Sequence, residues 1–310
     1  MDDVNEILEE EKDFGFARIY SVELKYKQKP KLDRDLLYQK MELYTGTTSM
    51  PDQKEADTGE LAVWEAYEPD MGPMLHFFHM NYMLGYAEGE MPAQTSLMNI
   101  EHRPAEEYIT AVQQSWHWRE AEQTLEECNY SLTLIDIMAS GLEPKSRLEL
   151  FSGALRAVLE TCPCDAIYFR ESDKLVEPKA YLAAVEEGAI LYGAMNLRLY
   201  NVEGTGSERA EKLMDTVGLA ALGIPDIQCH YYDLEPNEVA DHMSNIGYYL
   251  FSQGDIIQDG ETVGFTEDMR WRCEHQYALA APHRVVLDLD PGAPYYAGRQ
   301  NNSDPADETE

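Results

Sequence analysis

Cysteine and histidine lie close together at two places in the C-terminal third of the chain. Cys273 and His275 are two residues apart, so on a β-strand their side chains would face the same side. Cys229 and His230 would add a further ligand if their strand lay beside that one. This set could hold a metal ion, but it lacks the Cys-x-x-Cys or His-x-x-x-His spacing of usual zinc sites. The alternative is a buried cysteine beside a hydrogen-bonded histidine, and no resident metal is predicted.

Asp288 and Asp290 also have a spacing that could serve chemistry. On a strand these carboxylates would share a face and lie about 7 Å apart. That separation suits acid–base catalysis or a divalent cation. Pro291 and Gly292 follow directly, which is typical of a strand that ends in a turn. Both interpretations, an active site and a strand end, stay open.

The segment Gly204-Thr-Gly-Ser207 lies between a predicted strand and a predicted helix, where backbone N–H groups could bind a phosphate. The surrounding residues depart from nucleotide motifs, because Arg209 stands where a third glycine is needed and Glu203 and Glu208 add negative charge. A serine-capped turn is therefore favoured. The chain also lacks a Gly-x-Ser-x-Gly elbow. We predict no cofactor, and the catalytic residues of any enzyme here stay unknown.

Residues 116–119 read Trp-His-Trp-Arg, the densest group of residue types that binding hot spots favour. Both tryptophans could pack in the core, or one could lie in a groove or at a helix break. Arginines in so acidic a chain are often paired with particular carboxylates, and such pairing can also be structural. The candidate partner-binding residues are Trp116, Trp118, Arg119, Arg198 and Arg272.

Charge narrows the class of partner. The chain of 310 residues has 24 Lys and Arg against 58 Asp and Glu, a formal net charge of −34. Both ends are acidic, but most of the excess belongs to the residues between them. Such a field repels phosphate, so we predict no direct nucleic-acid binding. It favours a basic protein partner, such as a toxin or a nucleic-acid-processing enzyme. A salt-adapted surface and a mimic of nucleic acid are the alternatives.

The composition indicates a folded chain outside the membrane. Hydrophobic residues make up 44% of the sequence, which is enough to bury a substantial core. No stretch of about 18 apolar residues and no signal peptide is visible, so we expect a cytoplasmic protein without a membrane partner. The odd number of cysteines predicts reduced core thiols.

The hydrophobic pattern predicts an α+β fold in which helices pack on a mixed β-sheet, either as one sheet or as two lobes. Strands are expected over residues 17–26, 61–67, 75–86, 92–100, 130–138, 165–169, 196–202, 226–232 and 284–289. Helices are expected over residues 33–44, 104–116, 119–128, 144–162, 178–185, 208–222 and 236–251. A hairpin is expected over residues 256–265, with its turn at Asp259-Gly260.

The same patterns predict four regions. They are an acidic leader (residues 1–15), an N-terminal α+β subdomain (16–103), a C-terminal α/β-type domain (104–298) and an acidic disordered tail (299–310). The oligomeric state stays open.

Five short segments mix Trp, Gly, Pro, Cys and His in a fixed order. They are residues 113–118 (QQSWHW), 138–143 (MASGLE), 191–196 (LYGAMN), 223–230 (GIPDIQCH) and 286–292 (VLDLDPG). As a set they resemble a bacterial family, the domain of unknown function 4261, over about residues 16–298. The resemblance implies a bacterial-type cytoplasmic protein and brings no assigned activity. Residues 225–230 and the helix after them are also similar to suppressor-of-fused-like domains, many of which look like immunity proteins.

Together these observations predict a non-enzymatic binding protein, an inhibitor or immunity-type protein that engages a basic partner through an acidic surface. The alternative is an enzyme, such as a hydrolase, with an unrecognised active site in the C-terminal half. A nucleic-acid mimic is a further alternative.

Overall fold

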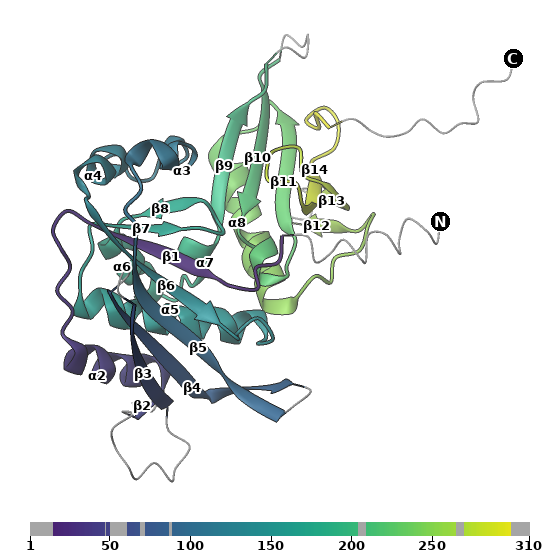
Figure 1. Cartoon of the computed structure of the whole chain (residues 1–310). Coiled ribbons are helices and arrows are strands. Elements are labelled where there is room, and N and C mark those ends of the chain that lie inside the picture. Colours follow the sequence, from purple (N-terminus) through teal and green to yellow (C-terminus); the bar gives the residue numbers. More distant parts are fainter. Residues whose placement is uncertain are drawn as a thin grey trace, which may run out of the picture.

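The structure is a computed structural model that describes residues 15–46, 48–49, 61–68, 72–86, 89–203, 209–264 and 270–298. The predicted acidic leader up to residue 14, the predicted tail at 299–310 and the glycine-rich segment at 204–207 lie outside the described residues. The predicted α+β class is confirmed, because helices pack against two β-sheets (Figure 1).

The first sheet has the strand order β2-β3-β4-β5-β6-β1-β7-β8. Its strands are β1 (Ser21–Tyr26), β2 (Thr48–Ser49), β3 (Leu61–Glu68), β4 (Gly72–Tyr86), β5 (Gly89–Ile100), β6 (Tyr130–Ile137), β7 (Ala166–Phe169) and β8 (Lys174–Val176). The strand β1 pairs antiparallel with both β6 and β7. Val22 and Leu24 face the apolar core, and Glu23 and Lys25 face the opposite side, because side chains alternate along a strand.

Helices cover both faces of this sheet. On the core face lie α2 (Arg34–Thr45), whose N-cap Asp33 accepts a hydrogen bond from the backbone N of Leu36 at 3.1 Å, and α5 (Pro144–Thr161). On the opposite face lie η1 (Ala105–Tyr108), α3 (Ile109–Gln113) and α4 (Ala121–Glu127). The helix predicted over residues 104–116 is thus divided into a 3₁₀ turn and a short α-helix.

The second sheet has the strand order β12-β13-β14-β11-β10-β9. Its strands are β9 (Asn196–Asn201), β10 (Glu211–Val217), β11 (Asp226–Tyr232), β12 (Thr262–Gly264), β13 (Arg270–Tyr277) and β14 (Val285–Asp290). Its main helix is α8 (Pro236–Gln253), which packs on β10 and β11. The apolar stripe predicted for this helix is confirmed, because Val239, Met243, Ile246 and Leu250 are all buried.

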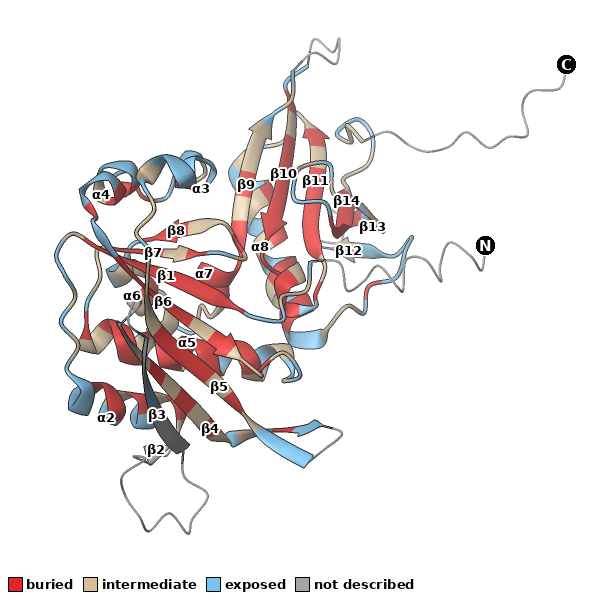
Figure 2. Ribbon diagram, in the orientation of Figure 1, coloured by how far each residue is buried: buried red, intermediate tan, exposed pale blue. Residues whose placement is uncertain are grey.

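The connection from the first sheet to the second contains α6 (Pro178–Glu186) and α7 (Leu191–Ala194), and η2 (Ala220–Leu222) follows β10. A single apolar core joins the two sheets, since Leu24 of β1 and Leu287 of β14 belong to one cluster. Figure 2 shows that β1, β10 and β11 are mostly buried. Among the described residues no helix combines the length and hydropathy that crossing a bilayer requires.

The division between the sheets does not fall at Pro104, the boundary expected from the sequence. The strands β5 and β6 pair across that position, and the sheets separate between Val176 and Asn196. The predicted boundary between residues 103 and 104 therefore does not coincide with a break in the sheet.

Two sequence predictions are wrong. The helix expected over residues 208–222 is the strand β10 where it is described, because pairing with both β9 and β11 outweighs the local helical spacing of Leu213 and Val217. The hairpin expected over residues 256–265 is also absent. Asp259-Gly260 instead leads into β12, which pairs with β13, a strand that the sequence analysis did not list.

A buried ion network joins β9, β10 and β11 to the residue before β14. The Arg284 guanidinium donates through Nε to Asp226 at 2.9 Å and through Nη2 to Asp215 at 2.9 Å. Arg198 donates to the same Asp215 carboxylate at 2.9 and 2.5 Å, and Thr216 donates to Asp226 at 2.9 Å. Arg198 and Arg284 are 3% and 1% exposed, so their charges depend on these partners.

Replacing Arg284 by methionine is expected to lower the free energy of unfolding by about 3–5 kcal/mol, because Asp226 would stay buried without its cation while Asp215 keeps only Arg198. Urea denaturation at neutral pH measures the loss. The matched control is Arg272→Met, which removes an exposed ion pair with Glu274 and should cost far less. Equal losses for the two variants would contradict a special role for the buried network.

Candidate binding site

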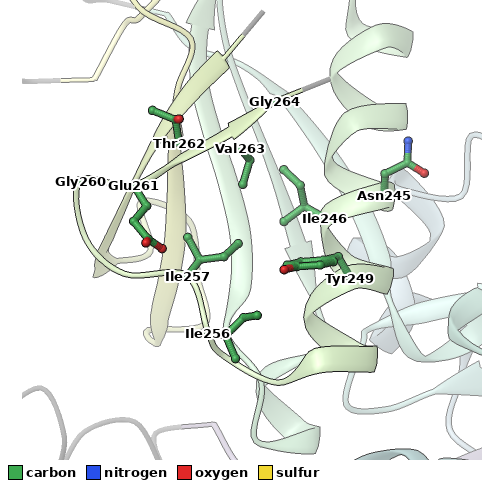
Figure 3. A pocket seen from close by; sticks show the side chains of 10 residues that line it. All are labelled: Asn245, Ile246, Tyr249, Ile256, Ile257, Gly260, Glu261, Thr262, Val263 and Gly264. Carbon is green, nitrogen blue, oxygen red and sulfur yellow. The ribbon is translucent and has the colours of Figure 1, made fainter. Parts of the chain in front are cut away.

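A groove of about 850 Å³ lies between α8 and β12. Figure 3 shows Ile246 and Tyr249 of α8 pointing toward Ile257 and Val263 on the other side. Tyr249 is 47% exposed and Ile256 beside it is 48% exposed. Exposed apolar side chains that gather in a concave place are typical of a binding surface. The residues that line the groove are Asn245, Ile246, Tyr249, Ile256, Ile257, Gly260, Glu261, Thr262, Val263 and Gly264.

Two glycines shape this groove. Gly254 ends α8 with a φ of +83°, and its N–H donates to the Leu250 carbonyl at 2.7 Å. Gly260 has a φ of +85°, and its N–H donates to the Cys273 carbonyl at 2.8 Å. The loop between these glycines therefore leaves the helix, carries Ile256 and Ile257 past its last turn and joins β12.

One carboxylate stands in the apolar lining. Glu261 lies in the groove, where one of its oxygens accepts from the Gln258 backbone N at 2.8 Å. His242 packs edge-on against Trp271, whose strand partner Val263 lines the groove. Burial lowers the pKa of His242, and the negative charges of the α8 residues Glu238 and Asp241 oppose that shift. Charges of both signs lie near this groove, because Arg270 and Arg272 of β13 pair with Gly264 and Thr262 of β12.

His275 of β13 contacts two aspartates of the loop between Gly254 and Gly260. Its Nδ1 lies 2.7 Å from an oxygen of Asp259, and its Nε2 lies 3.1 Å from an oxygen of Asp255. The hydrogen bonds to Asp255 and Asp259 raise the pKa of His275, although burial opposes them. With both ring nitrogens donating, the protonated imidazolium is the form that this geometry favours.

The residues considered as metal ligands do not converge. Cys273 and His275 share one side of β13, as expected, but His275 is held by its two aspartates. Burial raises the pKa of Cys273 to about 11 and also raises that of Cys229. His230 lies 2.8 Å from Glu211 instead. All five cysteines are free, and no group of three or more metal-binding side chains occurs within the described ranges.

Asp288 and Asp290 terminate a strand. Asp288 is 3% exposed, accepts from Gln228 and from the Tyr296 hydroxyl at 2.9 Å each, and has its pKa raised by burial. Asp290 is the last residue of β14 and accepts from the Gly292 backbone N at 2.7 Å. These contacts support the strand-end interpretation over an active site.

The tryptophans lie in the turns between α3 and α4. Trp116 is 65% exposed, whereas Trp118 packs in a small apolar cluster and is 9% exposed. Arg119 is exposed. Arg198 is buried in the ion network, so a partner cannot reach it, and Arg272 is exposed beside Glu274.

Sequence reasoning missed the groove itself. The available signal was the pair Ile256-Ile257, which stands in a loop between Gly254 and Gly260 and has no helix or strand of its own to pack on.

The pKa shift of His275 predicts how stability depends on pH. Because the folded state raises this pKa, the contribution is fully present below the unfolded pKa of about 6.5. It is lost as the pH rises through the folded value. The stability difference between the wild type and His275→Gln should therefore be larger at pH 5.5 than at pH 9, as measured by urea denaturation. A difference that grows toward pH 9 would oppose this assignment.

Comparisons with known proteins agree with the resemblance noted from the sequence. A family model described as Domain of unknown function (DUF4261) matches residues 215–290, a span that includes every residue lining the groove. No curated protein and no solved structure matches the chain. The weaker likeness to suppressor-of-fused-like immunity domains stays a prediction. Residues 215–290 thus carry the sequence pattern of the domain of unknown function 4261, which supports the predicted resemblance over that part of the chain.

Proposed function

We propose that this chain is a non-enzymatic, cytoplasmic binding protein of the inhibitor or immunity type. Its groove between α8 and β12 holds a basic segment of a partner protein, such as a toxin or a nucleic-acid-processing enzyme. The observation that carries the proposal is an open apolar groove that contains the carboxylate of Glu261, in a chain with a net charge of −34.

The distribution of cations supports a negative exterior. Each fully buried cation of the described residues pairs with a buried carboxylate: Lys25 with Glu23, Arg147 with Asp136, Arg198 with Asp215 and Arg284 with Asp226. These cations neutralise acids inside the fold, while exposed carboxylates such as Glu127 and Glu274 pair with surface cations. Among the described residues the surplus of acids over bases thus lies mainly on exposed or partly exposed side chains, where it attracts a basic partner.

The position of β12 supports an extended occupant. This strand is the edge strand of the second sheet, and its three residues line the groove. A peptide that adds to such an edge sends alternate side chains to opposite sides. Apolar residues of the peptide would contact Ile257 and Tyr249, while basic ones would reach Glu261 and Asp241.

The enzyme alternative has less support in the described part of the chain. His230 and His275, its main candidates, have separate carboxylate partners. A pocket of about 190 Å³ beside His275 is lined by Asp255 but does not include His230. The two histidines therefore do not share a site.

A fluorescent octapeptide of alternating lysine and valine tests the proposed function. Anisotropy should show binding that weakens as NaCl is raised, because salt screens the attraction, and a glutamate–valine peptide should not bind. The Ile256→Lys variant should weaken binding by about tenfold or more, through lost apolar contact and added repulsion.

The matched control is Leu43→Lys, the same change at an exposed residue of α2, which should alter binding less than about twofold. Trp116→Ala separates the two candidate surfaces. Loss of binding in Trp116→Ala together with full binding in Ile256→Lys would overturn the assignment to the groove. Equal binding of the two peptides would overturn the role of charge.

A further inference from the structure

A second groove, of about 720 Å³, lies under the first sheet and has a different character. Its apolar lining includes Leu32 from the segment between β1 and α2, and Leu75, Leu97 and Leu132 from β4, β5 and β6. Figure 1 shows that segment curving along one side of the first sheet. The groove is outside the part of the chain that the family model matches.

The charged lining of this second groove is cationic. Lys29 and Arg34 line it, and no carboxylate does so among the described residues. That is unexpected in a chain in which 58 acids stand against 24 bases. The ion pair between Arg34 and Glu65, at 2.5 Å, holds the guanidinium near the opening and leaves further N–H donors on it.

A histidine forms part of the polar wall. The Nδ1 atom of His102 lies 3.2 Å from the Ser131 hydroxyl, which also contacts the buried Lys25 ammonium at 3.1 Å. The Nε2 atom of His102 is then the ring nitrogen that can contact a ligand. Both His102 and Ser131 line the groove.

Positive charge also lies behind this wall. The Glu23 carboxylate pairs with Lys25 at 2.7 Å, with Arg170 at 2.8 Å and with Arg103. Arg103 also lies 3.5 Å from Glu107, so the cluster sets three cations against two carboxylates and keeps a net positive charge. A negative group in the second groove would be attracted by this cluster as well as by Lys29.

We propose that the second groove binds a small amphipathic anion, with an alkyl chain against the partly exposed Leu32 and the outer rim of the buried Leu75, Leu97 and Leu132, and a carboxylate or phosphate head at Lys29 and Arg34. The volume lies in the range of small-molecule pockets, and an apolar lining with a few polar groups is the usual composition of such sites. The observations for this site are independent of the proposed partner binding.

Calorimetric titration of the full chain with ten-carbon probes tests the site. Decanoate and decyl phosphate should each bind at least about tenfold more tightly than decanol, which has the chain without the charge. The tighter of the two anions identifies the head group. Decylamine, with the opposite charge, should bind more weakly than decanol. Decanol binding as tightly as both anions, or no binding of either anion at millimolar concentration, would overturn the proposal.

Two charge reversals locate the head group. Lys29→Glu should weaken decanoate binding by about tenfold and leave decanol binding unchanged, because only the ionic contact is lost. Lys179→Glu makes the same change on the exposed side of α6, away from the groove, and should have little effect. If both variants weakened decanoate binding equally, the effect would come from the net charge of the protein. That result would contradict a head-group site at Lys29.

Discussion

The second sheet depends on one desolvated arginine. Arg284 directly precedes β14, and its guanidinium reaches Asp215 on β10 and Asp226 on β11. It also donates to the backbone carbonyls of Pro282 and Thr216. The guanidinium is planar and rigid, and its acceptors are fixed on several strands. These hydrogen bonds therefore restrict how far the strands can shift relative to one another. Since β13 pairs with β14 and β12 pairs with β13, the position of the groove follows from this anchor.

Much of the fold could be predicted from local pattern. The helix α8 has a strong apolar stripe and Pro236 at its start, and β1 has a clear alternation, so both appear nearly where expected. The strand β10 could not be predicted in the same way. Its residues Leu213, Met214 and Val217 have spacings that suit a helix, and only pairing on both sides makes them a strand.

The candidate sites were harder to predict, because they depend on residues distant in sequence. The sequence singled out Arg198 as an arginine that could be structural, but its contact with Asp215 exists only because β9 pairs with β10. The groove between α8 and β12 forms only where the helix, the loop after it and the strand come together. Trp116 and Trp118 differ in exposure because the chain leaves helical geometry between α3 and α4, a change that the residue types alone do not reveal.

The strand β12 is only three residues long, Thr262–Gly264. An edge this short offers few backbone hydrogen-bond partners to a foreign strand. Non-specific strand pairing with other chains is therefore only weakly stabilised. Recognition at this edge must then come mostly from the side chains beside it. In the proposed complex, how long an occupant stays bound would then depend on those side chains more than on the backbone of the strand.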